Sequence, residues 1–96
     1  MLTADQLLGQ SAWRTFLELD RARGLAKGAA FKAFKALGPR LVEGQHFYCC
    51  DARADAAALA IIRASGRVYP ATINAVFLTA CGQALVASLL DGSRLP

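Results

Sequence analysis

The sequence predicts a small, mostly helical α+β domain with a two- or three-stranded β-sheet, and three observations lead to that prediction. The chain has 96 residues, a length that suits one domain covering residues 1–96. Hydrophobic residues make up 55% and charged residues 19% of the chain, which excludes a disordered protein. Apolar side chains recur at helical spacing in several segments, whereas two other segments combine apolar or aromatic residues with small ones.

A short helix is predicted at the start of the chain, and a longer helix follows it. Thr3 and Gln6 have the spacing of a capping box, in which each side chain bonds the other residue's free backbone amide. Ser11 is the expected cap of a helix over residues 12–23, which Gly24 ends. The stripe expected to be buried comprises Trp13, Phe16 and Leu17, with Asp20 at its end.

A third helix is predicted over residues 28–37, after a short connection that contains Gly24 and Gly28. Gly38 and Pro39 end it, because glycine suits the last turn and proline cannot continue a helix. The expected core face comprises Ala30, Phe31, Phe34 and Leu37. The opposite face comprises Gly28, Ala29, Lys32, Lys35 and Ala36.

The second half of the chain alternates between expected strands and helices. Residues 46–50 predict a strand, and Asp51 is the expected cap of a helix over residues 52–65. Residues 73–78 fit either a second strand or part of one longer helix. A final helix is predicted over residues 80–90.

The longest stretch without charge covers 23 residues, from Val68 to Leu90, a length that can cross a membrane as a helix. Polar and turn-forming residues divide this stretch, so we expect a buried strand and a helix instead of a membrane span. The N-terminus has no basic stretch ahead of an apolar run, so no secretory signal is predicted. We therefore expect a cytoplasmic protein.

Cysteine usage predicts neither disulfides nor a metal site. The chain has three cysteines, Cys49, Cys50 and Cys81, and an odd count with two neighbours is unlike a disulfide framework. In a strand, Cys49 and Cys50 would point to opposite faces. With one histidine and no Cys-x-x-Cys pair, a zinc site lacks ligands. We expect small buried thiols and no cofactor.

Charge is distributed unevenly along the chain, whose net charge is +4. Seven cations and two anions lie between Arg14 and Arg40, whereas the remainder carries four cations and five anions. The whole positive excess therefore falls on the second and third predicted helices and their connection. Concentrated positive charge beside small residues on a helix face is typical of nucleic-acid binding.

Two helices joined by a glycine-containing turn over residues 12–37 predict a helix-turn-helix. In that motif the second helix enters the major groove of duplex DNA, and the amides of Gly28 and Ala29 would hold a phosphate at its start. The side chains expected to contact DNA are Arg21, Arg23, Lys27, Lys32, Lys35 and Arg40. The open alternative is an amphipathic helical hairpin whose lysines only face water.

Residues 41–48, with the sequence LVEGQHFY, resemble the entry to the wing in excisionase-type and phage-regulator winged-helix proteins. Tyr69, residues 77–79 and Gly82 resemble the returning strand and closing helix of small phage regulators. The resemblance covers roughly residues 25–85 and implies a winged helix-turn-helix with a basic wing near the minor groove. About twenty residues separate the two strands here, where a short hairpin tip is usual. Candidates for the wing contact are Arg53, Arg63 and Arg67.

No motif in the sequence predicts an enzyme. His46 is the only histidine, and four residues of strand would place it about 13 Å from Cys50, too far to share a proton. Gly24 and Gly28 are not followed by the Gly-Lys-Ser/Thr of a phosphate loop. We expect no catalytic activity and no small-molecule substrate, and we expect His46 to bind phosphate or face solvent.

The final predicted helix suggests a partner. Leu85, Val86, Leu89 and Leu90 cover a wide arc of it, more than a small domain can easily bury. This arc predicts a homodimer, which would suit a palindromic DNA site. The leading hypothesis is a DNA-binding transcription regulator or architectural factor. The alternative is an adaptor module that binds a protein partner through this helix.

Overall fold

The computed structural model describes residues 3–92, which form a small α+β domain. The described helices are α1 (Ala4–Leu8), α2 (Phe16–Ala22), α3 (Ala29–Leu37), α4 (Ala56–Ala64) and α5 (Ala80–Gly92), with a 3-10 turn at Gly38–Arg40. The described strands are β1 (Phe47–Asp51) and β2 (Asn74–Leu78), on either side of α4 in the chain. The predicted α+β class with a small sheet and the predicted helical segment between the strands are confirmed.

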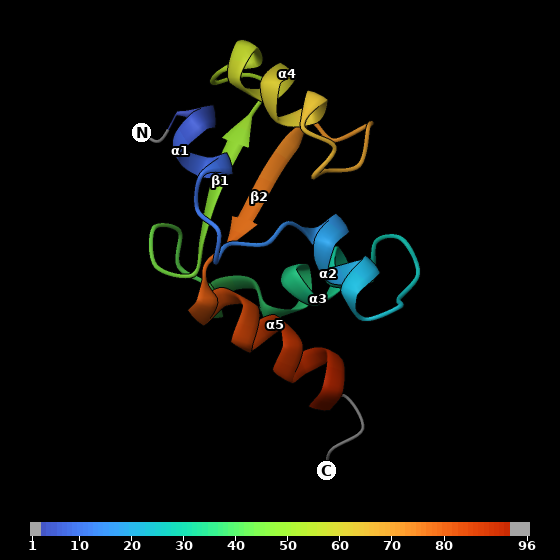
Figure 1. The fold of residues 1–96 in the computed structure, drawn as a ribbon. Helices are drawn as coiled ribbons and strands as arrows, with labels where there is room; N and C mark the ends of the chain where they lie inside the picture. The colour runs from blue at the N-terminus through green and yellow to red at the C-terminus, as the bar shows by residue number, and fades with distance from the viewer. Residues whose placement is uncertain (1–2, 93–96) are drawn as a thin grey trace.

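The two strands form an antiparallel sheet, and Figure 1 shows α4 at one end of the strands and α2, α3 and α5 at the other. Ala75 and Phe77 belong to the core formed with α1 and α4. Val76 and Leu78 belong to a second core formed with α2, α3 and α5. Because successive strand residues point to opposite faces, β2 contributes to both cores at once. This explains why residues 75–78 are continuously apolar and why periodicity could not distinguish strand from helix over residues 73–78.

The neighbouring cysteines follow the same alternation. Cys50 is buried in the core on the side of α1 and α4, and Cys49 packs against the core on the other side. The prediction that these two thiols point to opposite faces is confirmed. All three cysteines are free, and Cys81 is exposed on α5.

α2 begins at residue 16, not at residue 12 as predicted. Its cap is Thr15, whose hydroxyl accepts a hydrogen bond from the Glu18 amide while the Glu18 carboxylate accepts one from the Thr15 amide. The residues before Thr15 cannot be helical, because Arg14 exchanges two backbone hydrogen bonds with Leu78 (3.1 and 2.8 Å) and extends the chain there. Trp13 accordingly packs against the α1–α4 core, not on the stripe of α2.

α4 is shorter than the predicted helix over residues 52–65, because a different aspartate caps it. The Asp55 carboxylate accepts a hydrogen bond from the Ala58 amide (2.9 Å). Asp51 instead accepts one from the Arg53 amide (2.7 Å), which tightens the turn that leaves β1. Both aspartates are suitable caps by type, and the sequence alone did not distinguish them.

The uncharged stretch from Val68 to Leu90 is divided between β2 and α5, as predicted. In the described part of the chain, no helix combines the length and the apolar character that a membrane crossing requires.

Candidate nucleic-acid interface

α2 and α3 form a packed helical hairpin at the end of the sheet opposite α4 (Figure 1). Residues 23–28 connect the two helices. Gly24 (φ 65°) and Gly28 (φ 92°) both adopt the left-handed conformation, which glycine reaches without the steric cost that a side chain adds. The glycine-containing connection predicted from the sequence is therefore the turn between these helices.

The two lysines of α3 project into solvent. Ala30, Ala33 and Leu37 form the buried stripe of the helix, and Lys32 and Lys35 lie outside it and are exposed. Lys32 and Lys35 are three residues apart, so their side chains are neighbours on the helix surface. The face of α3 that carries these lysines is thus open to a large partner.

Phe31 corrects one prediction about α3. It was expected on the core face, but it is 46% exposed, and its ring lies edge-on to Phe16 with 5.6 Å between ring centroids. Ala33 takes its place in the core. The small side chains of Ala30 and Ala33 let α3 approach the rest of the domain closely, which turns Phe31 outward.

Asp20 is the buried group that holds the start of α3. It is 1% exposed, and its carboxyl oxygens accept hydrogen bonds from the amides of Gly28 (3.0 Å) and Ala30 (2.8 Å). The Tyr69 hydroxyl donates a third bond (2.6 Å). Burial, followed by the contact with Asp20, raises the pKa of the Tyr69 phenol, so this hydroxyl keeps its proton.

The expected phosphate site at the start of α3 is therefore wrong. The Gly28 amide is bound to Asp20, and the Ala29 amide donates to the Ala26 carbonyl (3.1 Å). A carboxylate already occupies the position where an anion would benefit from the helix dipole. The sequence signal was the position of Asp20 at the end of an otherwise apolar stripe, because a buried carboxylate needs hydrogen-bond donors around it.

Arg67 is held inside the domain and is left out of the candidate surface. Its guanidinium donates to Glu18 (3.0 and 3.1 Å) and to the carbonyls of Leu8 and Trp13 (both 3.0 Å). It also lies over the Phe77 ring, 5.3 Å from the ring centroid. These contacts join α1, α2 and the segment before β2, so Arg67 has a structural role that its position in the sequence does not reveal.

We expect acid to weaken the fold through this pair. Burial raises the pKa of Glu18, but the hydrogen bonds from Arg67 and Thr15 and the charge of Arg67 together lower it by more. The pKa of Glu18 therefore lies below its ordinary value of 4.5. A carboxyl whose pKa is lower when folded stabilises the fold above its unfolded pKa, and this contribution disappears as the pH falls through the folded value. The free energy of unfolding, measured with urea, should therefore decline as the pH falls below about 4.5.

Substituting the arginine tests this assignment. Arg67→Met should lower the free energy of unfolding by about 2 kcal/mol at neutral pH, and it should flatten the decline in acid. Arg53→Met, which changes an exposed arginine, should retain the wild-type profile. If the free energy of unfolding of Arg67→Met fell as steeply with decreasing pH as that of the wild type, the pairing of Arg67 with Glu18 would be contradicted.

The basic span from Arg14 to Arg40 has seven exposed cations, and six of them form no ion pair with another described residue. One of the six, Arg14, lies before α2 and donates hydrogen bonds to the carbonyls of Ser11 and Trp13; the other five form one set. We call this set the basic surface; it comprises Arg21, Lys27, Lys32, Lys35 and Arg40, all exposed. Arg23 differs, because it forms an ion pair with Asp91 of α5. Arg53 precedes α4 and Arg63 lies on it, so neither belongs to the α2–α3 hairpin.

Within residues 3–92, no hydrogen bond joins His46 to a cysteine thiol. The His46 Nδ1 atom accepts a hydrogen bond from the Val42 amide (2.8 Å) and so stabilises the turn before β1. Burial, followed by the charges of Glu43 and Asp51, raises the pKa of the Cys49 thiol to about 11. A thiol with such a pKa is a poor nucleophile at neutral pH.

α5 is more closely packed than its sequence suggests. Val86 is buried, and Leu85, Leu89 and Leu90 are partly buried against the core formed with α2 and α3. The most exposed large apolar residues among those described are Phe31, Val42, Ile61 and Ile73, and none of these lies on α5. The structure thus offers less support for a partner surface on α5 than for one elsewhere.

Comparison with models of protein families, with curated proteins and with solved structures gave no match. The functional proposal below therefore depends on the chemistry of this chain's own surface.

Proposed function

We propose that this protein binds duplex DNA through the α2–α3 hairpin, with α3 in the major groove. The observation that carries the proposal is the separation of charge within the basic span. Its two anions are held by internal contacts, Glu18 with Arg67 and Asp20 with the start of α3. The five side chains of the basic surface are exposed and form no ion pair with a described acid, and such a surface attracts phosphates.

The shape of α3 also supports the proposal. The helix has nine residues, and small residues such as Ala36 stand beside Lys32 and Lys35 on its exposed side. These small residues leave room for the helix backbone to approach the major groove on this side. The exposed Phe31 ring lies against Phe16 and Lys35. Lysines contribute mainly phosphate contacts, which position the protein and carry little sequence information.

The resemblance to winged-helix proteins is compatible with this proposal. It implies a helix-turn-helix followed by two antiparallel strands, and here α2, α3, β1 and β2 follow in that order. α4 occupies the place of the hairpin tip. We propose no wing contact from Arg67, because its guanidinium is used within the domain. A role as transcription regulator or architectural factor would follow from DNA binding by α3.

A salt titration tests the proposal most directly. Binding to a fluorescein-labelled duplex of about twenty base pairs, measured by fluorescence anisotropy, should weaken steeply as salt rises. If three to five cations of the basic surface contact phosphates, the slope of log affinity against log salt should be about −3 to −4.5. An affinity that hardly changes with salt, or no binding at low salt, would refute the proposal.

A double variant locates the contact on α3. Lys32→Ala combined with Lys35→Ala should reduce the salt slope by about two and weaken binding on the order of tenfold at moderate salt. Because both side chains are exposed, the free energy of unfolding should be nearly unchanged. Arg53→Ala is the matched control, since it removes an exposed cation away from the hairpin. Equal DNA affinity for the double variant and the wild type would exclude α3 as the contact.

A further inference from the structure

The outer edge of β2 is mostly unpaired. The Ile73 carbonyl accepts a hydrogen bond from the chain leaving β1 (3.0 Å), whereas Leu78 bonds Arg14 on the outer side. Backbone groups of successive strand residues point to alternate edges, so those of Asn74 and Val76 point outward. Within residues 3–92, no hydrogen bond reaches the outward amides and carbonyls of these two residues.

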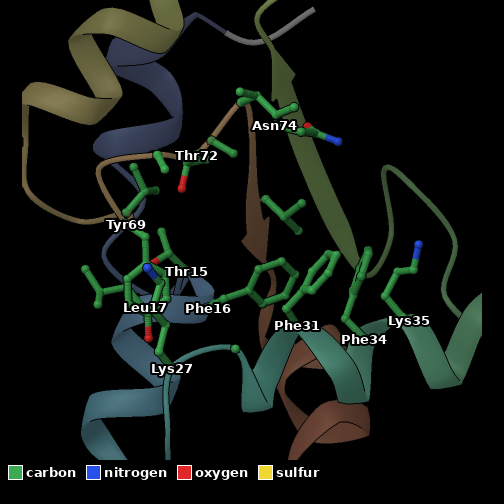
Figure 2. Close-up of a pocket in the computed structure, with 16 residues that line it drawn as sticks. Thr15, Phe16, Leu17, Lys27, Phe31, Phe34, Lys35, Tyr69, Thr72 and Asn74 are labelled. Carbon is green, nitrogen blue, oxygen red and sulfur yellow. The ribbon is translucent and has the colours of Figure 1, made fainter.

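A groove of about 620 Å³ lies beside this edge (Figure 2). Its walls come from α3, the start of α2 and the segment before β2. Phe31, which is 46% exposed, and Ile73, which is 69% exposed, both line it. Several large apolar side chains exposed at one groove mark interaction sites more often than single ones do, so this groove is a candidate for a partner.

The floor of the groove contains backbone groups that lack a partner. Val76 lines the groove and is only 5% exposed, so its outward amide and carbonyl are largely shielded from bulk water. Folded proteins pair nearly all such groups. A strand added along this edge would supply the missing hydrogen bonds to Val76 and to Asn74.

The charged residues that line the groove indicate the charge of its partner. Its charged lining residues are Lys27 and Lys35, and Figure 2 shows them on opposite sides of the ring of Phe31. The Lys27 ammonium lies over the Tyr69 ring at 5.1 Å, and the Lys35 ammonium lies 5.7 Å from the centroid of the Phe31 ring. Neither lysine is neutralised by a described acid, so the groove favours a negatively charged partner.

We propose that this groove binds an extended, acidic segment of a partner protein, which adds a third strand to the outer edge of β2. The backbone of the segment bonds Asn74 and Val76, its apolar side chains at alternate positions pack against Phe31 and Ile73, and its carboxylates pair with the two lysines. Strand addition of this kind takes its affinity from main-chain bonds and its specificity from side-chain contacts.

This inference goes beyond DNA binding and can fail separately from it. Lys32 and Arg40 belong to the basic surface but do not line the groove. Asn74 and Ile73 line the groove and belong to β2 and the segment before it. Lys27 and Lys35 belong to both sites, so changes at these two lysines affect both affinities. Changes at Lys32 and Arg40 should affect DNA binding alone, and changes at Ile73 and Asn74 should affect peptide binding alone.

The first test compares three labelled nine-residue peptides in which valine alternates with a second residue type. Measured by fluorescence anisotropy with the full chain, the peptide with glutamate should bind on the order of tenfold more tightly than the peptide with lysine. The third peptide carries glutamate and has N-methyl groups on the amides of one edge, which removes its strand donors, so it should bind far more weakly. Equal affinity for all three peptides would overturn the proposal.

Variants of the chain locate the peptide. Asn74→Pro removes an outward amide at the first residue of β2, where proline leaves the pairing with β1 intact, and it should weaken peptide binding about tenfold. Lys27→Glu should weaken it on the order of tenfold by charge repulsion. Lys32→Ala should change it by less than about twofold, because Lys32 does not line the groove.

Amide exchange of the wild-type chain gives an independent measurement. In the complex with the glutamate peptide, hydrogen exchange of the Asn74 and Val76 amides, followed by NMR, should slow markedly. The Phe77 amide points toward β1 and should change much less. Unchanged exchange at both Asn74 and Val76 would overturn strand addition even if a peptide binds.

Discussion

Asp20→Ala is expected to lower the free energy of unfolding by about 3–4 kcal/mol, a large share of the 5–15 kcal/mol typical of a domain. The Asp20 carboxyl group is buried and accepts hydrogen bonds from the amides of Gly28 and Ala30 and from the Tyr69 hydroxyl. Alanine leaves all three donors without a partner in a site that water scarcely reaches. Urea unfolding followed by circular dichroism measures the loss.

Two further variants show whether the loss of stability comes from the three hydrogen bonds of Asp20 or from removing any aspartate. Tyr69→Phe removes one of the three bonds and should cost about 1 kcal/mol. Asp5→Ala changes an exposed residue of α1 and should alter stability by no more than about 0.5 kcal/mol. If Asp20→Ala and Asp5→Ala had similar stabilities, Asp20 would not anchor the start of α3.

Gly82→Ala is expected to lower the free energy of unfolding, whereas helix propensity alone predicts that it would raise it. Alanine normally stabilises a helix interior by about 1 kcal/mol relative to glycine. Here a Cβ atom at Gly82 would lie 1.9 Å from the backbone oxygen of His46, so α5 and the chain entering β1 would have to separate. We expect a net loss of about 3 kcal/mol, measured as a lower urea midpoint.

Ser88→Ala provides the control for this variant, because Ser88 is exposed on the same helix. It should leave stability unchanged or raise it by a few tenths of a kcal/mol. A stability for Gly82→Ala equal to or above that of the wild type would show that α5 does not approach β1 as closely as described.

Element types were more predictable than element boundaries. The capping box of Thr3 and Gln6 is present, since it depends only on neighbouring residues. The start of α2 was mispredicted because Arg14 pairs with Leu78, a residue 64 positions further along the chain. Ser11 and Thr15 are both acceptable caps locally. The distant strand decided between them by holding Arg14 extended.

The positive charge of the candidate site could be predicted from the sequence, whereas the contacts of its individual side chains could not. The sequence alone located the positive excess, and the exposure of Lys32 and Lys35 follows from their spacing against the apolar stripe of α3. Asp20 bonds the nearby amides of Gly28 and Ala30, but its third partner, Tyr69, is 49 positions away. The partners of Arg67 include Glu18 and Leu8, which are 49 and 59 positions away. No local pattern reveals a contact of that range.

Local patterns were sufficient to predict the helical segments, the glycine turns and the concentration of cations between residues 14 and 40, because each depends on spacing along a short piece of chain. Long-range packing instead makes β2 a strand buried on both faces and leaves its outer edge open beside Phe31 and Ile73. Burial and strand pairing join residues far apart in the chain, and the free energy of those contacts overrides the weaker local preferences.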